Sequence, residues 1–420
     1  MKSISSAAAL LASACFVSAA TPQLVSFTNN SPVPSGAAYF LSNEPSGNYL
    51  FAAAIGSNAQ LTLEKGYYTG GKGAHAVGFN ALFSQGAVVV HQNLSAVFTV
   101  NAGSNSISAF AIDPAVPTNL KMVGQPVSSG GDFPISIAVN SQGSMVCALN
   151  GGTKDGISCF TFSPSSGLKP IPDTYRNLNL NQTTPPVGPD TTFGQIIFAD
   201  NDTKLVVSVK GVSESPLNIP GFIALWDVYP DMSLSIGYSP IIGGVWPWGL
   251  SALPGRNVIV ASDGITGINV YDVDAWSHQP MTQASLYLPP MEFKGALCWN
   301  TYSDATGNFY FVDTLGSNVY EVHIDQDSLA PRLVTSYALQ AYQGLKTNDV
   351  PTDISVTTVS GVDRMYVLAS NKTSIAVYSL SGAGQGILEQ RMDFEAPIVG
   401  ARLALNRDNV LGLATYVINA

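Results

Sequence analysis

Short runs of apolar and β-branched residues recur along the whole chain, separated by clusters of Gly, Asn, Asp, Ser and Pro. Such runs are typical of β-strands joined by turns. No stretch shows the 3.6-residue periodicity that marks an amphipathic helix. The pattern therefore predicts an all-β protein.

One unit of this pattern repeats. It consists of a strand, a loop that starts with Asn or Asp, and a strand that ends near an acidic residue; the copies at 98–113 and 311–325 share Gly-Ser-Asn. Further short strands precede and follow each copy, which gives four strands per unit of about 50 residues, the composition of a β-propeller blade. Six units are complete. In them, the strand that precedes the Asn/Asp loop ends at Asn101, Asn150, Lys210, Ser262, Asp313 and Ala369.

The two ends of the chain supply a further blade. Residues 38–43, 48–55 and 61–68 match the last three strands of a unit, and residues 401–406 match its missing first strand. Joining them closes the ring without a free sheet edge. We therefore predict one seven-bladed β-propeller domain over residues 21–420, with four-stranded blades and one blade shared by the N- and C-terminal strands. The strand predicted at 411–418 has no place in this scheme. A pair of large β-sandwiches is the alternative, but it does not explain the repeat.

The first 20 residues match a secretory signal peptide. Lys2 precedes an apolar run at 7–17, and the small residues at 18–20 lie ahead of Thr21. A membrane anchor is the alternative, but the run is shorter than the roughly 20 residues that span a bilayer. The Asn-x-Ser/Thr pattern of N-glycosylation occurs at Asn29, Asn93, Asn181, Asn201 and Asn371. We expect a secreted glycoprotein, extracellular or associated with a cell wall.

Three cysteines remain once a leader is removed. Cys147 and Cys159 flank the loop at 151–156, and a hairpin symmetric about Thr153 places the two thiols opposite each other. A cross-strand disulfide is expected in an oxidising compartment; two buried thiols are the alternative. Cys298 is expected to be a small buried apolar residue.

The charge balance excludes several partners. Only 11% of the 420 residues are charged, against about 25% in an average domain, and 18 Lys+Arg against 28 Asp+Glu give a net charge of −10. Nucleic acid and anionic membranes require clustered basic residues, so neither is expected as a partner. The charged residues of a cleft are correspondingly few, and each is a candidate for function.

Five short strings carry information on lineage: LFSQG at 82–86, VNAGSN at 100–105, LNGG at 149–152, TFGQ at 192–195 and VSVKG at 207–211. With them the chain resembles the secreted fungal branch of the lactonase-type seven-bladed propellers, the group related to 3-carboxy-cis,cis-muconate cyclase and to propeller 6-phosphogluconolactonases. The resemblance spans nearly the whole chain after the leader. It implies a small-molecule site on one face of the central channel, and a lactonase or cycloisomerase (intramolecular lyase) activity.

The repeat locates that face independently. In each blade, the loop that leads into the first strand and the loop between the second and third strands emerge on the same side. Candidate catalytic residues on it are His75 as a general acid or base, Lys210 as a cation, Glu214 beside it, and Arg402 at the start of the last inner strand. Candidate ligand-binding residues are Asn101, Asn150, Trp246, Trp248, Asp263, Lys294 and Asp313.

Each candidate also has a structural interpretation. In that interpretation His75 is an ordinary residue of a Gly-rich loop, and Lys210 would pair with Glu214 to brace a long loop. Asn and Asp at strand ends commonly bond to nearby backbone, and Trp residues commonly pack between blades. A zinc site is not expected, because there is no His/Cys cluster, and no cofactor is indicated.

Two functional hypotheses stay open at this stage. The relatives named above act on multiply charged anions, which calls for several Arg or His in one pocket. This chain has seven Arg, and its loops at 131–134 and 192–195 contain no basic residue. The protein is therefore either a lactonase or cycloisomerase for a small lactone or organic acid, or a non-catalytic binding propeller. A monomer with a lactone, organic acid or sugar-like ligand is expected.

Overall fold

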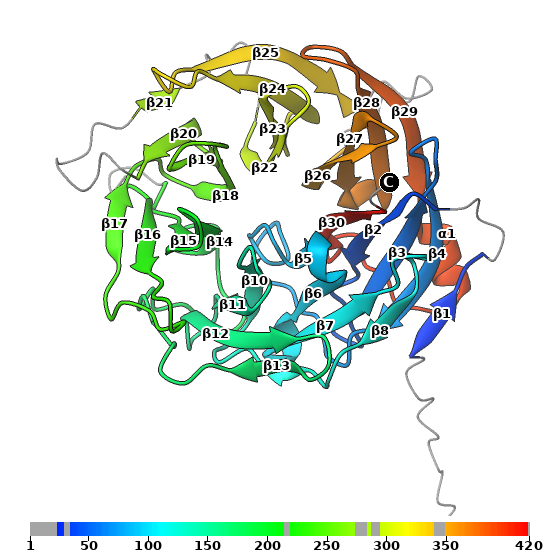
Figure 1. Ribbon diagram of the computed structural model, residues 1–420, viewed down its shortest axis with the longest axis horizontal. Coiled ribbons are helices and arrows are strands. Elements are labelled where there is room, and N and C mark those ends of the chain that lie inside the picture. Colours follow the sequence, from blue (N-terminus) through cyan, green and yellow to red (C-terminus); the bar gives the residue numbers. More distant parts are fainter. Residues whose placement is uncertain are drawn as a thin grey trace, which may run out of the picture.

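The computed structural model describes residues 23–28, 34–213, 219–273, 295–339 and 349–418, together with the backbone of strand β21 at 284–286. Seven antiparallel sheets stand around a central axis (Figure 1). In six of them the first strand along the chain is innermost, and in the seventh the C-terminal strand takes that place. The fold is thus the predicted all-β, seven-bladed propeller. No helix among these residues is long and apolar enough to cross a membrane.

The blades are numbered here from the first sheet made of consecutive strands. From the channel outward, blade 1 consists of β5 (Val88–His91), β6 (Ala96–Asn101), β7 (Ser106–Ile112) and β8 (Leu120–Met122), with β9 (Val127–Ser128) beside β7. Blade 2 consists of β10 (Pro134–Val139), β11 (Met145–Asn150), β12 (Gly156–Ser163) and β13 (Gly167–Pro170). Blade 3 consists of β14 (Phe193–Ala199), β15 (Lys204–Val209), β16 (Phe222–Asp227) and β17 (Ser239–Ile242).

Blades 4 to 6 follow the same order. Blade 4 consists of β18 (Pro247–Ala252), β19 (Val258–Asp263), β20 (Gly267–Asp272) and β21 (Ala284–Leu286). Blade 5 consists of β22 (Leu297–Ser303), β23 (Asn308–Asp313), β24 (Asn318–Ile324) and β25 (Pro331–Ala338). Blade 6 consists of β26 (Pro351–Val359), β27 (Val362–Ala369), β28 (Ser374–Leu380) and β29 (Gly386–Asp393). Short 3-10 helices η1 (Gln92–Leu94), η2 (Ala102–Ser104) and η5 (Ser370–Lys372) form turns within blades.

Blade 7 joins the two ends of the chain, as predicted, but its inner strand is not the predicted one. The order from the channel is β30 (Leu411–Val417), β2 (Gly36–Leu41), β3 (Tyr49–Ile55), β4 (Leu61–Tyr68) and β1 (Leu24–Ser26). The prediction of a strand at 401–406 was wrong: helix α1 (Glu395–Gly400) and a turn precede a coil there. The physical reason is that 401–406 has no β-branched or aromatic residue, whereas β30 ends in Thr415, Tyr416 and Val417.

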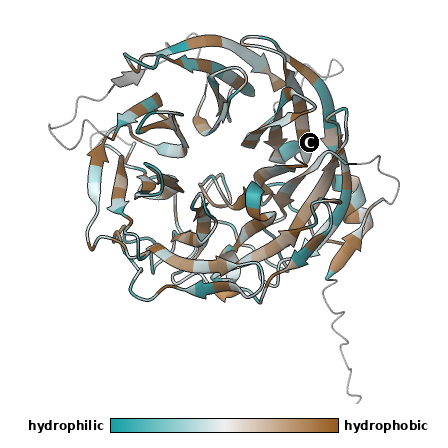
Figure 2. Cartoon of the chain, viewed as in Figure 1, coloured by the Kyte–Doolittle hydropathy of each residue, from teal (hydrophilic) through white to brown (hydrophobic). Residues whose placement is uncertain are grey.

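The blades bury both of their faces against neighbouring blades. All residues of β2 and β3 are buried, and hydrophobic residues occur on strands around the whole ring (Figure 2). The outer strand β29 is mostly half-exposed. Burial on both faces explains why the inner strands read as near-continuous apolar runs rather than as strict alternation.

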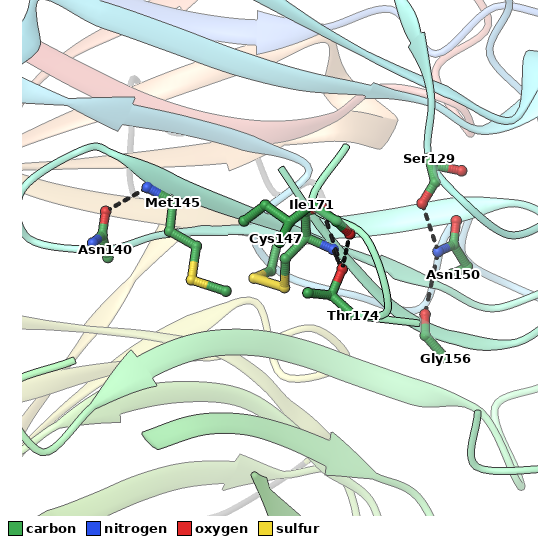
Figure 3. Close-up of a disulfide and its surroundings, with 9 residues drawn as sticks. Ser129, Asn140, Met145, Cys147, Asn150, Gly156, Ile171 and Thr174 are labelled. Atoms are coloured by element: carbon green, nitrogen blue, oxygen red, sulfur yellow. Dashed lines mark hydrogen bonds between the residues drawn. A yellow bond between two sulfur atoms is a disulfide. The ribbon is translucent and has the colours of Figure 1, made fainter. Parts of the chain in front are cut away.

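The predicted disulfide is present in blade 2. Cys147 of β11 and Cys159 of β12 are direct cross-strand partners and are joined (Figure 3). Both residues are buried, and the hydroxyl of Thr174 accepts a hydrogen bond from the Cys159 N–H at 3.0 Å. Cys298 is a buried free cysteine, as expected, and burial raises the pKa of its thiol to about 12.

Removing this crosslink is expected to destabilise the propeller. The paired change Cys147→Ala and Cys159→Ala should lower the free energy of unfolding by about 2–4 kcal/mol, because a closed loop restricts the unfolded chain. Urea denaturation of the oxidised proteins measures the difference. Cys298→Ala is the control, since it also shortens a buried side chain but breaks no crosslink. An equal loss in both variants would assign the effect to packing alone.

The centre of the ring is crossed by the chain itself. Residues 82–87, called here the channel segment, precede β5 and lie near the axis in Figure 1. The Ser84 hydroxyl donates to the carbonyl of Ile135 in blade 2 (2.8 Å), and the Trp299 indole of blade 5 donates to the Ser84 carbonyl (2.9 Å).

Gln85 extends these contacts. Its backbone N–H donates to the Gly194 carbonyl of blade 3 (3.1 Å), and its side-chain amide donates to the Asn300 carbonyl of blade 5 (2.8 Å). The channel segment therefore connects blades on opposite sides of the axis, and the string LFSQG serves to hold the ring together.

Candidate functional site

The Asn residues that end β6 and β11 are fully buried. Asn101 donates to the Ser108 hydroxyl (2.9 Å) and accepts from the Thr69 hydroxyl (2.6 Å). Asn150 donates to the Gly156 carbonyl (3.2 Å), while its amide oxygen has no hydrogen-bond partner among the described residues. Asn150 thus closes the loop that follows its strand, whereas Asn101 links β7 to the residue that follows β4. Their role in ligand binding stays a prediction.

The two Asp residues in the equivalent positions also bind loop backbone. Asp263 accepts from the N–H groups of Ile265 (2.9 Å) and Thr266 (2.8 Å). Asp313 accepts from the Gly316 N–H (2.8 Å), and burial raises its pKa although backbone hydrogen bonds oppose the shift. These contacts match the loop-forming interpretation of strand-end carboxylates, and ligand contact by either residue is untested.

The four predicted catalytic residues are not brought together by the described contacts. His75 is half-buried, with Nδ1 2.5 Å from the Ala76 carbonyl oxygen. Arg402 was predicted to begin the last inner strand; this was wrong, because it lies exposed in the turn after α1, with φ 62°. Glu214 and the predicted ligand-binding Lys294 lie outside the described residues.

Lys210 lies in the interior, at the end of β15. It is only 2% exposed, and its ammonium donates to the carbonyls of Phe83 (2.8 Å) and Phe193. The Nζ atom lies 4.1 Å from the ring centre of Trp248. Burial lowers the Lys210 pKa well below its usual value. Since Phe83 belongs to the channel segment, Lys210 fastens that segment to blade 3.

Aromatic rings surround this lysine. Trp248 is fully buried, with ring centroids 5.5 Å from Trp299 and 6.1 Å from Phe83. The ring centroid of Phe79 lies 6.2 Å from that of Trp248, and the Phe79 side chain is about half exposed to solvent. The predicted ligand-binding Trp248 thus packs beneath the channel segment. A ligand cannot reach Lys210 or Trp248 while these aromatic contacts persist.

An open pocket lies beside the channel, on the predicted face. Its volume is ≈ 550 Å³, and we call it the rim pocket. It lies among the segment between blades 2 and 3, the loop after β15 and the residue before β18. Its lining residues are Asn181, Gln182, Thr183, Val187, Gly188, Pro189, Asp190, Thr191, Ser213 and Trp246.

Trp246 is fixed in the wall of the rim pocket. Its indole N–H donates to Asp190 Oδ1 at 2.6 Å, and the Ser213 N–H donates to the same oxygen at 3.0 Å. The neighbouring Gln182 amide donates to the Thr191 hydroxyl (3.0 Å) and accepts from the Val187 N–H (2.9 Å). These bonds order the wall before any ligand arrives.

Sequence reasoning placed Asp190 and Trp246 in loops on this face but named only Trp246 as a ligand-binding candidate. The remaining residues come mainly from 181–191, a connection with no regular secondary structure. One signal for it was present, because the interval from Asn150 to Lys210 is the longest in the repeat. Long connections in compact domains are commonly functional.

The predicted glycosylation sites differ in exposure. Asn93, Asn181 and Asn201 are exposed, and Asn181 lines the rim pocket. Asn371 is half-buried, and its side-chain oxygen accepts from the Val350 N–H at 2.8 Å. Asn29 and the predicted leader lie outside the described residues. Glycosylation and secretion stay predictions.

A buried carboxyl stands at the ring closure and gives a pH prediction. Asp353 of β26 accepts from the Leu413 N–H of β30 at 2.8 Å, and burial raises its pKa from 3.8 to about 8. Ionisation therefore favours the unfolded chain. The contribution of Asp353 to the free energy of unfolding should be fully present below pH 4, where the carboxyl is protonated in both states. Between pH 4 and pH 8 this contribution should fall by about 1.4 kcal/mol per pH unit.

The substitution Asp353→Asn isolates this effect. The two carboxyl oxygens accept from the N–H groups of Ile354 and Leu413, and Asn keeps one of these acceptors but cannot ionise. The variant's stability should therefore change much less between pH 4 and pH 8 than that of the wild type. Urea denaturation from pH 4 to 9 measures both curves, with Asp327→Asn at an exposed position as control. Parallel curves for the Asp353→Asn variant and the wild type would contradict the prediction.

The described residues include no group of three or more His, Cys, Asp or Glu side chains that could hold a metal ion.

Comparison with known proteins identifies the fold. No protein-family model matches the chain, and no curated protein matches it in sequence. Among solved structures, the periplasmic gluconolactonase PpgL of Pseudomonas aeruginosa is 12% identical with a TM-score of 0.61, and the comparison covers 92% of this chain and 100% of that one. A Bacteroides fragilis protein assigned provisionally as a 6-phosphogluconolactonase is 13% identical, with a TM-score of 0.60 over 92% and 99%.

A third similar structure has no assigned function. It is a protein of Desulfotomaculum acetoxidans that is 12% identical, with a TM-score of 0.57 over 92% of this chain and 100% of that one. At these identities the likeness extends to the seven-bladed architecture shared with lactonase-type propellers. It leaves activity and substrate to be argued from the site.

Proposed function

We propose that this chain binds a small, uncharged, polyhydroxylated ring, such as a sugar or a sugar lactone, in the rim pocket beside Trp246. The observation that carries the proposal is the composition of the pocket wall: one aromatic face set among amides, hydroxyls and a single carboxylate. Aromatic side chains in small-molecule sites supply contact area, and ordered polar groups fix the ligand's orientation; the polar majority of this wall suits a ligand rich in hydroxyl groups.

The charge of the wall selects the ligand class. Among the residues that the structure describes, no Lys, Arg or His lines the rim pocket. Binding a muconate or a phosphorylated sugar acid would bury anionic groups without a cation to pair them, which costs free energy. Hydroxyl groups, in contrast, find acceptors at Asp190 and both donors and acceptors at Gln182 and Thr191. Neutral ligands are therefore favoured.

The position of the rim pocket also shifts the expected site. The sequence resemblance places the ligand at the central channel, but the channel segment and its bonds to Ile135 and Asn300 occupy the centre. The rim pocket lies beside it on the same face. In the proposed setting, outside the cell or at its wall, the protein acts as a binding propeller for neutral carbohydrate-like compounds.

A lactonase acting in the same pocket is the second candidate, and Asp190 is the observation that favours it. Its carboxylate could take a proton from a water molecule as that water attacks the lactone carbonyl. The ring C–O bond then breaks, the proton passes to the departing ring oxygen, and a hydroxy acid results. We place binding first because, in the described part of the chain, no cation lines the pocket to stabilise the oxyanion.

The experiment exposes purified protein to neutral sugars, glucono-δ-lactone and muconolactone. Calorimetry measures binding, and titration of released acid measures turnover. Binding without turnover supports the binding propeller. Turnover lost in Asp190→Asn supports the lactonase, since Asn still accepts the Trp246 hydrogen bond. Turnover lost in His75→Ala, or in a Lys210→Ala protein that still unfolds like the wild type, but not in Asp190→Asn, would assign chemistry to the residues predicted from sequence. Absence of binding and turnover would refute both candidates.

A further inference from the structure

Three large apolar side chains are exposed next to the rim pocket. They are Val77 (55%), Phe79 (57%) and Val187 (51%), and we call them the apolar ridge. In a chain with so much buried apolar surface, exposed apolar side chains that adjoin each other and a pocket are candidates for ligand contact.

The ridge is continuous with the pocket wall. Val77 and Val187 pair in a parallel β-bridge, in which the Val77 N–H donates to the Pro186 carbonyl (2.8 Å) and the Gly188 N–H donates to the Val77 carbonyl (3.1 Å). Val187 itself lines the rim pocket. The ridge thus begins inside the pocket and extends from there to Val77.

Phe79 continues the ridge toward the channel. Its ring lies 5.6 Å from that of Phe83 in the channel segment and 6.2 Å from that of Trp248. These contacts support one side of the Phe79 ring from below, while the side chain keeps more than half of its surface exposed. The ridge therefore has a firm base, so an apolar group can bind there without ordering a loose surface first.

We infer that the ligand is amphiphilic: a glycoside or sugar lactone that carries an aryl or alkyl group. This inference rests on the proposed function, since the polyhydroxylated ring occupies the rim pocket beside Trp246. The apolar group then extends over Val187 and Val77 toward Phe79. The shared residue Val187 determines this choice, because it places the apolar surface within reach of substituents on a ring bound in the pocket.

Pairs of ligands that differ only in the apolar group test the inference. Methyl and phenyl glycosides of glucose, galactose, mannose and N-acetylglucosamine are compared by calorimetry. For the sugar that binds, the phenyl glycoside should bind about tenfold more tightly, because burial of its ring on the ridge removes apolar surface from water.

Val77→Thr is the diagnostic variant. It keeps the β-branched shape but replaces a methyl by a hydroxyl, and Val77 does not line the pocket. It should weaken phenyl glycoside binding about fourfold and leave methyl glycoside binding unchanged. Val399→Thr is the matched control, because Val399 is similarly exposed (52%). It lies on α1, which connects blade 6 to blade 7 and is far from blade 3 around the ring (Figure 1).

The outcomes separate the inference from the proposed function. Equal affinity for methyl and phenyl glycosides would overturn the inference and leave the proposed function intact. A phenyl preference that Val77→Thr does not reduce would also overturn it. Concentration-dependent dimers that Val77→Thr dissociates would assign the ridge to a second copy of the chain instead. Failure of every glycoside and of glucono-δ-lactone to bind would remove the proposed function as well.

Discussion

Removing residues 411–420 is expected to abolish the folded ring. This deletion takes away β30, which pairs with β2 along its full length and closes blade 7. Leu411, Leu413 and Tyr416 are buried in the core, so the truncated chain would expose their partners as well as the unpaired edge of β2. The loss should exceed the roughly 5–15 kcal/mol by which a typical domain is stable.

Soluble yield, circular dichroism and thermal unfolding measure this effect. The truncated protein should be insoluble or should lack a cooperative transition. Removal of 419–420 alone, which keeps β30 whole, is the matched control and should leave the transition unchanged. A cooperative transition of the 411–420 deletion near that of the full chain would show that β30 is dispensable for closure.

Replacing Trp246 by Ala is expected to weaken ligand binding on the order of 100-fold, because aromatic side chains at the centre of a site commonly carry much of the binding free energy. The change removes the aromatic wall of the rim pocket and leaves Asp190 without its indole donor. Trp246→Phe keeps an aromatic face but not the hydrogen bond to Asp190, so its ligand affinity should lie between those of the wild type and Trp246→Ala.

Calorimetry with the tightest neutral ligand measures the Trp246 effect, and thermal unfolding checks that the fold is intact. Tyr238→Ala is the control, because Tyr238 is an exposed aromatic residue that stacks on Phe222 away from the pocket. Similar affinity in the wild type and in Trp246→Ala would rule out the rim pocket as the binding site.

Trp246 and Lys210 differ in how much of their position the sequence could predict. The sequence placed Trp246 on the face where the rim pocket opens, because the register of the repeat fixes which loops emerge together. It could not show that Lys210 is enclosed by the channel segment, since the Lys210–Phe83 bond joins residues 127 positions apart. Burial by a distant segment changes a candidate catalytic cation into a structural donor.

The rim pocket illustrates the same limit. Its wall combines Asp190, Ser213 and Trp246 from three separate connections. Their side chains carry no shared pattern in the sequence, and only the packing of blade 3 against blade 4 brings Trp246 to Asp190. A pocket formed by irregular loops therefore depends on the finished ring, whereas each blade is specified locally.

The sequence by itself determined the blade, its repetition, the seven-fold ring with shared ends and the Cys147–Cys159 pair. All of these follow from local patterns: the alternation of strands and turns, a fixed repeat length, and a hairpin symmetric about its own loop. The tertiary structure decided which C-terminal segment closes the ring, where the channel segment lies and where a ligand can enter. The reason is that β30, unlike 401–406, can satisfy both the hydrogen bonds of β2 and the packing around it, and that competition is resolved only when residues from opposite ends of the chain meet.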